Sequence, residues 1–378
     1  MKRSFDMTRS GTTEWSETTA RLNKVARSRG FSGRTLLLSA AVGFPASIAL
    51  LMLSLRSLDG RALHESLHSA NPAVLALAVC ASSLVYVVQA ARWRLVAQPS
   101  PPLPFRRFLD WAVGAIAVNN VVPGRPGDLL RIEWLSRAAK MPRARALASV
   151  VVDRGLDLAV LVAALAFTYP SVGNAHRIDH VGVVALLLVM LAGLVVIGAV
   201  AYSRRARRAP VGRLRSFVTN VACEVCSRVR GWRGVAAVML SLLAWGLWSA
   251  SAWLVASSVG IPLTPLDLLF VTAVINLGVA IPSSPGFIGT YQWLSVWSLG
   301  VLGVNHTSAF AFSILMHAAW FVPTTLAGAV LILRKCPPLV AGLIADRRSQ
   351  GNVAGRVVAL PRKLPTADAV GARAKTRR

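Results

Sequence analysis

The sequence predicts an all-α polytopic membrane protein, with about six full spans and two broken or re-entrant hairpins arranged as an inverted repeat. Three observations lead to this fold class. Of the 378 residues, 54% are hydrophobic and only 15% are charged. The mean hydropathy is +0.56, which is not typical of a soluble domain of this length. Long apolar runs alternate with polar or basic stretches, and clusters of proline and glycine interrupt two of the runs.

The basic residues are distributed unevenly along the chain. There are 42 Lys and Arg against 15 Asp and Glu, a formal net charge of +27. Such a charge can indicate nucleic-acid binding, but here the basic residues gather in segments 21–34 and 204–230 and from residue 334 onward, between apolar runs. This is the positive-inside pattern, with the anionic inner leaflet as the counter-charge. We therefore expect a bacterial inner-membrane protein with both termini cytoplasmic and no nucleic-acid partner.

Six apolar runs have the length of a membrane helix, about 20 residues. They lie at 35–55, 72–91, 146–169, 181–202, 235–259 and 308–333. Segment 203–233 carries apolar residues every three or four positions among arginines, which predicts a cytoplasmic amphipathic linker. Segments 1–34 and 335–378 are expected to be basic cytoplasmic tails, the second one disordered.

Two further apolar stretches, 105–137 and 265–304, contain Pro/Gly clusters at 123–127 and 282–286. Proline removes a donor and clashes with the preceding turn, so neither stretch is expected to form one continuous helix. Basic residues flank the first stretch on both sides, and nearly uncharged loops flank the second, so each is expected to enter and leave on the same side. Non-helical backbone at membrane depth must be satisfied by protein or water. The breaks are therefore expected to line a cavity.

The two halves of the chain, 35–169 and 181–333, each read as span, span, broken hairpin, span. Three crossings per half is an odd number, so the second half is expected to be inverted relative to the first. Asparagine precedes both breaks, at Asn120 and at Asn276. Inverted repeats with paired broken helices are typical of secondary transporters, whose substrate site lies between the breaks. The alternative is that Pro and Gly are simply common in membrane helices.

Charged and polar residues concentrate around the first break. Asn120 precedes it, and Arg125, Asp128 and Arg131 follow it, with Asp128 expected to cap the short helix beyond. A guanidinium holds phosphate with paired donors, so Arg125 and Arg131 suit an anionic headgroup. The alternative is that Arg131 and Glu133 lie at the membrane interface without binding a ligand.

The following span carries three charged residues near its middle. Asp153 and Asp157 are four residues apart and share a helix face, and Arg154 is three residues from Asp157. A rise of about 1.5 Å per residue puts Asp157 about 16 Å from the start of the helix, close to the bilayer midplane. Charges at that depth are costly unless they are paired or hydrated, which makes them candidate site residues. Alternatively, Arg154 and Asp157 only neutralise each other and hold helices together.

The second break has the composition of a helix start inside the membrane. Serine precedes Pro285, an arrangement typical of an N-cap followed by the first helical turn, whose free N–H groups attract anions. Glycines in this segment allow close backbone approach. The alternative is a kink that binds nothing. The candidate residues are Ser283, Ser284, Gly286, Gly289 and Tyr291.

These motifs resemble the lysylphosphatidylglycerol synthase transmembrane-region family, also called flippase-like domain proteins. The resemblance covers about 35–334, and its motifs are NVVPGRPGD at 120–128 with Arg131, DRGLD at 153–157 and IPSSPGFIGT at 281–290. Members fused to an aminoacyltransferase domain make and flip aminoacylated phosphatidylglycerol, and others are fused to or encoded near glycosyltransferases. The resemblance implies a flippase-type fold with a headgroup cavity. Asp128 and Asp153 stand where the family usually has Glu, which keeps the charge but shortens its reach.

We expect a lipid flippase or translocase that moves a phospholipid or a lipid-linked intermediate across the membrane, and not an enzyme, since no synthase domain is visible. The expected partner is an anionic phospholipid or a polyprenyl-phosphate-linked molecule, with no cofactor and no metal. Two alternatives stay open. A membrane-embedded enzyme of lipid-linked sugar metabolism would need a metal or nucleotide site, which the sequence does not reveal. A non-transporting protein would instead recruit a lipid- or glycan-biosynthetic enzyme.

Overall fold

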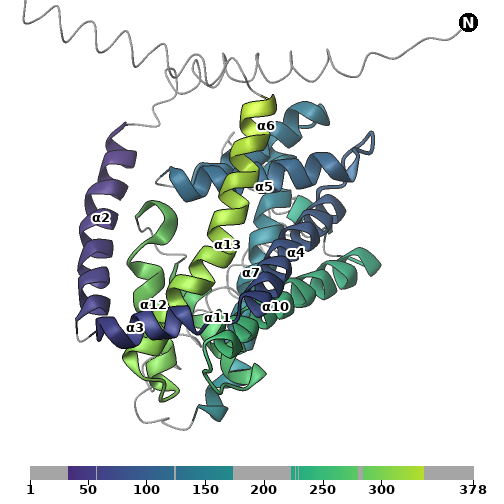
Figure 1. Ribbon diagram of the computed structural model, residues 1–378. Helices are drawn as coiled ribbons and strands as arrows, with labels where there is room; N and C mark the ends of the chain where they lie inside the picture. The colour runs from purple at the N-terminus through teal and green to yellow at the C-terminus, as the bar shows by residue number, and fades with distance from the viewer. Residues whose placement is uncertain are drawn as a thin grey trace, which may run out of the picture. The chain divides into compact units, whose positions relative to one another are not determined.

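The computed structural model describes residues 33–56, 58–122, 125–172, 223–225, 227–228, 230–279 and 284–335, and every regular element in these residues is a helix. The expectation of an all-α fold is confirmed for this part of the chain. Three helices are long and apolar enough to cross a membrane: α4 (Pro72–Ala97), α10 (Trp232–Ser258) and α13 (His306–Lys335) (Figure 1). They correspond to the predicted spans 72–91, 235–259 and 308–333.

Two further predicted spans are also helices. They are α2 (Gly33–Leu55) and α7 (Arg143–Thr168), and the short helix α3 (Gly60–His68) joins α2 to α4. Helix α7 has 26 residues, as many as α4, but its charged residues reduce its hydropathy. The predicted span 181–202 lies outside the described residues, as do both tails and most of the linker 203–233. The count of six crossings therefore stays a prediction.

Both predicted hairpins are broken into separate helices. The first consists of α5 (Phe105–Val121) and α6 (Gly127–Ala138). The second consists of α11 (Pro265–Gly278), the 3-10 turn η3 (Pro285–Phe287) and α12 (Thr290–Val301). The prediction that neither stretch is one continuous helix is confirmed, and re-entry on the same side stays a prediction.

Helices α4 and α10 pack along each other through small side chains. The buried face of α10 includes Ala237, Ser241, Ala244, Ser251 and Ala252, at spacings close to three and four residues. The Ser251 hydroxyl donates to the carbonyl of Ala78 on α4 at 2.8 Å. Because lipid is as apolar as a leucine side chain, membrane helices associate through close packing and interhelical hydrogen bonds. Small residues on this face allow that approach.

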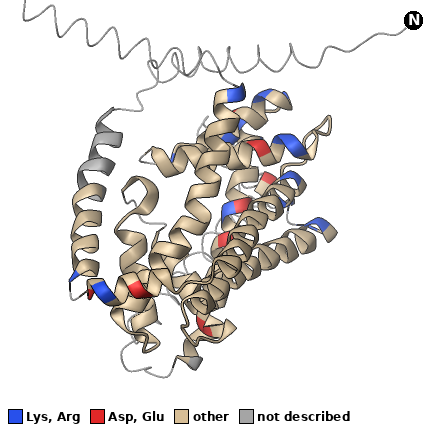
Figure 2. Ribbon diagram, in the orientation of Figure 1, with Lys and Arg blue, Asp and Glu red and all other residues tan. Residues whose placement is uncertain are grey.

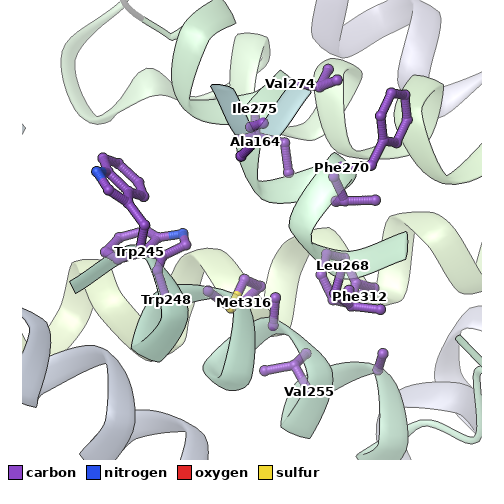
Figure 3. Packing of buried hydrophobic residues seen from close by; sticks show 14 of the residues in the cluster. Ala164, Trp245, Trp248, Val255, Leu268, Phe270, Val274, Ile275, Phe312 and Met316 are labelled. Carbon is purple, nitrogen blue, oxygen red and sulfur yellow. The ribbon is translucent and has the colours of Figure 1, made fainter. Parts of the chain in front are cut away.

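Helix α11 lies at the centre of the packed helices, because it is buried on nearly every side. Leu268 and residues 270–275 are all at most 8% exposed, as expected for a helix that is apolar all round. Its N-terminus is fixed by Thr264 and Asp267, whose side chains each accept from the other's backbone N–H, at 3.2 and 2.9 Å. Figure 3 shows part of the core that surrounds α11, with Ala164 of α7, Trp245, Trp248 and Val255 of α10, and Phe312 and Met316 of α13.

The charged residues of the described helices are concentrated at one end of the bundle. Figure 2 shows most of the Lys and Arg near α6 and the adjacent end of α4, and a smaller mixed group farther inside the bundle. At the basic end, the Arg228 guanidinium donates to the backbone carbonyls of Val96 and Ala97, the latter at 2.7 Å. A cation at the last carbonyls of a helix complements their partial negative charge, so Arg228 caps α4.

Candidate functional site

The charged group inside the bundle is built on one face of α7. Asp153 and Asp157 are 1% and 7% exposed, one helical turn apart and on the same side of the helix. The prediction that they share a face is confirmed. Both carboxylates are paired inside the bundle. Asp153 accepts hydrogen bonds from Arg92 and Arg131, and Asp157 accepts one from Arg92.

Arg92 of α4 is a residue of this group that sequence reasoning missed. From the sequence it was counted only among the basic residues that precede the stretch 105–137, but α4 continues to Ala97 and Arg92 is buried. Its side chain is 0% exposed. Nε donates to Asp153 Oδ1 at 2.8 Å, and Nη1 donates to Asp157 Oδ1 at 2.7 Å and to Ser241 Oγ of α10 at 2.8 Å. Arg92 therefore ties α4, α7 and α10 together.

Arg131 brings the first broken hairpin into the same group. Its Nη2 donates to Asp153 Oδ2 at 2.7 Å, so the Asp153 carboxylate lies between two arginines. The guanidinium carbon lies 4.1 Å from the centre of the Trp93 ring, a cation–π contact. Arg131 is 5% exposed, so it is buried inside the protein.

Asp128 has a different position from the one predicted. The residue before α6 is Pro126, so Asp128 lies in the first turn and is not the N-cap. The first N–H of the helix, that of Gly127, is instead satisfied by the side-chain oxygen of Asn119 at 2.7 Å. Asp128 Oδ1 accepts from Arg154 Nη2 at 2.7 Å and from Arg131 Nη1 at 3.4 Å. It therefore links α6 to α7.

Arg154 is the most accessible member of the group. Its side chain is 43% exposed, against 0% for Arg92 and 6% for Arg131. The expected pairing with Asp157 is present at 3.4 Å, but the shorter ion pair joins Arg154 to Asp128 at 2.7 Å. Its guanidinium is therefore the least buried of the three.

We call these six residues the charge cluster: Arg92, Arg131, Arg154, Asp128, Asp153 and Asp157. Three cations balance three anions, so the cluster is electrically neutral when all six groups are ionised. Two neutral side chains of α10 complete it: Ser241 Oγ accepts from Arg92 at 2.8 Å, and Trp245 Nε1 donates to Asp157 at 3.2 Å. Buried charges persist at membrane depth only when they are paired and hydrogen-bonded in this way.

The two breaks meet beside the charge cluster. The Arg125 guanidinium donates to the backbone carbonyl of Val279 and lies 4.8 Å from the centre of the Phe287 ring. Asn120 is 3% exposed and donates to Thr325 of α13 at 2.8 Å. A methyl group built on Gly286 would lie 3.5 Å from the Asn120 carbonyl. Residues of the first break thus contact both parts of the second hairpin.

The second break differs in detail from the predicted helix start. Ser283 lies outside the described residues. Ser284 precedes a single 3-10 turn and not a half-helix, and its hydroxyl donates to the Ile288 carbonyl at 2.7 Å. Gly286 and Phe287 have φ values of 68° and 58°, which interrupt helical geometry. Helix α12 begins only at Thr290.

Helix α2 closes over this break. The Ser284 N–H donates to Ser47 Oγ at 2.9 Å, and Ser47 Oγ also lies 3.2 Å from Thr290 Oγ1. Gly289 has φ of 91°, and a Cβ there would lie 2.0 Å from the Ser47 carbonyl oxygen. Only glycine allows the backbones to come this close.

Tyr291 follows on α12 and packs among aromatic side chains. It is 2% exposed, with ring centres 4.6 Å from His317 and 6.0 Å from Trp320. His317 Nδ1 is 2.9 Å from Gln292 Nε2, and Gln292 Oε1 accepts from the Gly289 N–H at 2.7 Å. Among the described residues, no three His, Cys, Asp or Glu side chains are grouped to hold a metal ion.

Comparison with known proteins adds three similarities. A family model described as the lysylphosphatidylglycerol synthase TM region matches residues 36–328. The UPF0104 membrane protein MJ1595 of Methanocaldococcus jannaschii is 22% identical over 298 residues, which cover 70% of this chain and 86% of that protein. The glycosyltransferase AglD of Haloferax volcanii is 25% identical over 332 residues, which cover 74% of this chain but only 52% of AglD. The similarity to AglD therefore spans about half of that relative.

Proposed function

The chain belongs to the lysylphosphatidylglycerol synthase transmembrane-region family, and we propose that it is a lipid flippase or translocase of the bacterial inner membrane. Its cargo is a phospholipid or a lipid-linked intermediate with an anionic headgroup. The headgroup passes beside the charge cluster and the two breaks, while the lipid tail stays in the bilayer. Both termini face the cytoplasm in this arrangement.

The observation that carries the proposal is the position of Arg154. Its side chain is 43% exposed although its partner Asp157 is nearly buried, so it is the cation of the cluster available to a headgroup. Arg125 lies close enough to Arg154 and Asp128 for their charges to interact. A phosphate between Arg125 and Arg154 would receive hydrogen bonds from two guanidinium groups. Arg92 and Arg131 are already committed to buried aspartates and act as positioning residues.

The packing of the halves supports an inverted repeat. Helix α4 of the first half packs on its counterpart α10 of the second. Helix α7 of the first half packs on α11 of the second. In the equivalent pair, α13 of the second half packs on α5 of the first. There the Asn120 side chain donates to Thr325, and a Cβ on Gly328 would clash with Ala117. Reciprocal packing of this kind is expected when two halves are related by a pseudo-twofold axis, as in transporters that alternate between two open states.

Reconstitution in liposomes tests the proposed function. Fluorescent phospholipids and polyprenyl-phosphate analogues are added to vesicles that contain the purified protein, and a membrane-impermeant quencher reports headgroup movement between leaflets. We expect wild-type protein to move at least one of these lipids, and Arg154→Gln and Asp157→Asn to abolish that movement. Arg61→Gln, an exposed arginine of α3, is the control for lost surface charge. No movement of any lipid by the folded wild-type protein would contradict the proposal.

A second candidate function is participation in lipid-linked sugar synthesis, because the relative AglD is named a glycosyltransferase. In that case the chain is a membrane-embedded enzyme or a non-transporting partner of a lipid- or glycan-biosynthetic enzyme. Incubation of the purified protein with polyprenyl phosphate and nucleotide sugars, followed by mass spectrometry, tests the enzyme. Co-purification of a stoichiometric enzyme, with lipid movement unaffected by Arg154→Gln, would favour the partner.

A further inference from the structure

A groove at the basic end of the bundle is separate from the charge cluster. Its volume is about 700 Å³, and it lies between the end of α4, the loop that follows it and the start of α10. None of its lining residues belongs to the charge cluster. Arg94, at its edge, is exposed, whereas Arg92, two residues earlier, is buried in the cluster. Helix α4 therefore presents one arginine to each of two different sites.

The groove has apolar walls and two cationic side chains. Leu95 of α4 and Ala236 and Leu240 of α10 line its walls. Arg94 and Arg233 also line it. The combination is amphipathic, because positive charge and apolar surface occur in the same cleft. Such a cleft matches a ligand with an anionic end and an apolar body.

Neither arginine has a carboxylate partner among the described residues. Arg94 Nε donates to the backbone carbonyl of Leu103 at 3.2 Å, and a neutral carbonyl does not cancel its charge. Arg233 lies 5.8 Å from the centre of the Trp232 ring. The N-cap of α10 is Gly231, which has no side chain to accept from the first N–H groups of the helix. The positive end of the 27-residue helix α10 therefore adds to the two guanidinium charges.

Trp232 indicates the level of this groove relative to the bilayer. It is 70% exposed at the start of α10, a helix long and apolar enough to span a membrane. Tryptophan is enriched at membrane–water interfaces, where its ring meets lipid headgroups. The groove thus lies where the apolar surface of a spanning helix meets the headgroup layer.

We propose that the groove holds an anionic phospholipid as a resident lipid, with its phosphate between Arg94 and Arg233 and one acyl chain along Leu95 and Leu240. Charge complementarity selects an anionic headgroup over a zwitterionic one. The apolar walls select a lipid over free phosphate, which has nothing to place against them. The resident lipid joins the end of α4 to the start of α10, the two helices that also hold Arg92 and Ser241. This assignment does not depend on whether the protein transports lipid.

Native mass spectrometry of the full chain released from phosphatidylglycerol nanodiscs tests the assignment. We expect one tightly retained phosphatidylglycerol, and no retained phosphatidylcholine from matched nanodiscs. The double variant Arg94→Gln/Arg233→Gln should retain phosphatidylglycerol about thirtyfold less strongly, since each interfacial basic residue contributes about fivefold. Leu240→Trp should also reduce retention, because it fills the groove without changing the charge.

The matched control is Arg106→Gln/Arg107→Gln, which removes two exposed arginines near the same loop but outside the groove lining. Retention should change less than twofold in this control and in Arg94→Lys/Arg233→Lys. Equal losses in the control and the groove variant would overturn the assignment in favour of general surface charge. Retention that survives both Arg94→Gln/Arg233→Gln and Leu240→Trp would also overturn it. Arg154→Gln should keep the lipid while losing transport, which separates this proposal from the proposed function.

Discussion

Replacing Arg92 with Gln is expected to destabilise the fold more than any other single arginine replacement in the charge cluster. The change removes the donors to Asp153, Asp157 and Ser241 and leaves two buried carboxylates with one cation fewer. The cluster then carries a net charge of −1 instead of zero. Breaking a buried ion pair by removing one partner costs about 3–5 kcal/mol of unfolding free energy. The complete burial of Arg92 places the expected loss in this range.

Arg154→Gln removes the same charge from the same cluster and provides the comparison. Its side chain is 43% exposed and Asp128 is 29% exposed, so solvent screens the pair. Exposed ion pairs contribute about 1 kcal/mol or less. The two variants therefore separate stability from transport, since Arg92→Gln should act mainly on unfolding and Arg154→Gln mainly on headgroup movement.

Unfolding by SDS in mixed micelles, followed by circular dichroism at helical wavelengths, measures the free-energy difference. The double variant Arg92→Gln/Asp153→Asn restores neutrality, so its loss should fall short of the sum of the single losses by about 1–3 kcal/mol. Arg92→Lys should be intermediate, because an ammonium cannot hold two carboxylates in the planar arrangement that Nε and Nη1 provide. Equal destabilisation by Arg92→Gln and Arg154→Gln, or additivity in the double variant, would refute the reasoning.

Two further predictions concern close backbone approach, and a third concerns a buried hydrogen bond. Gly289→Ala should lower the unfolding free energy by about 1–3 kcal/mol in the same assay, because its Cβ would lie 2.0 Å from the Ser47 carbonyl and its φ is 91°. Gly127→Ala should show a loss of similar size, since its Cβ would lie 2.1 Å from the Ala115 carbonyl of α5. The control is Gly155→Ala on α7, whose Cβ meets nothing within 4 Å and which should be neutral or slightly stabilising. Equal losses of unfolding free energy in these two variants would contradict the packing of α6 on α5. Ser47→Ala should lower the unfolding free energy by about 1–3 kcal/mol and make α2 more sensitive to limited proteolysis, because the Ser284 N–H loses its acceptor. Unchanged cleavage rates would count against closure of the break by α2.

The elements that periodicity and length define were predictable from the sequence. The apolar runs at 72–91, 235–259 and 308–333 become helices α4, α10 and α13, and the Pro/Gly clusters do divide both hairpins. The shared face of Asp153 and Asp157 followed from their spacing alone. These features are local, because residues close to one another in the sequence determine them.

Contacts between distant segments were not predictable in the same way. Arg92 was counted only as part of the basic flank of the stretch 105–137, because an arginine at the end of an apolar run usually follows the positive-inside pattern. Its true partners lie 61, 65 and 149 residues away in the chain. The sequence did contain a signal for a further buried cation. Two aspartates lie in the middle of α7, and Arg154 alone cannot neutralise both. Counting charges across the predicted spans would have left one negative charge unpaired and directed attention to Arg92.

The two ion pairs of Arg154 differ in a way that links cargo binding to helix movement. The pair with Asp157 lies within α7 and is long, 3.4 Å, whereas the pair with Asp128 joins α7 to α6 and is short, 2.7 Å. In the proposed function, a phosphate on Arg154 takes the place of the Asp128 carboxylate, because both are anions that require the same donors. Asp128 then keeps only its 3.4 Å contact with Arg131, on its own helix. Binding of the headgroup therefore breaks one of the two ion pairs that join α6 to α7, and leaves the other, between Arg131 and Asp153, in place.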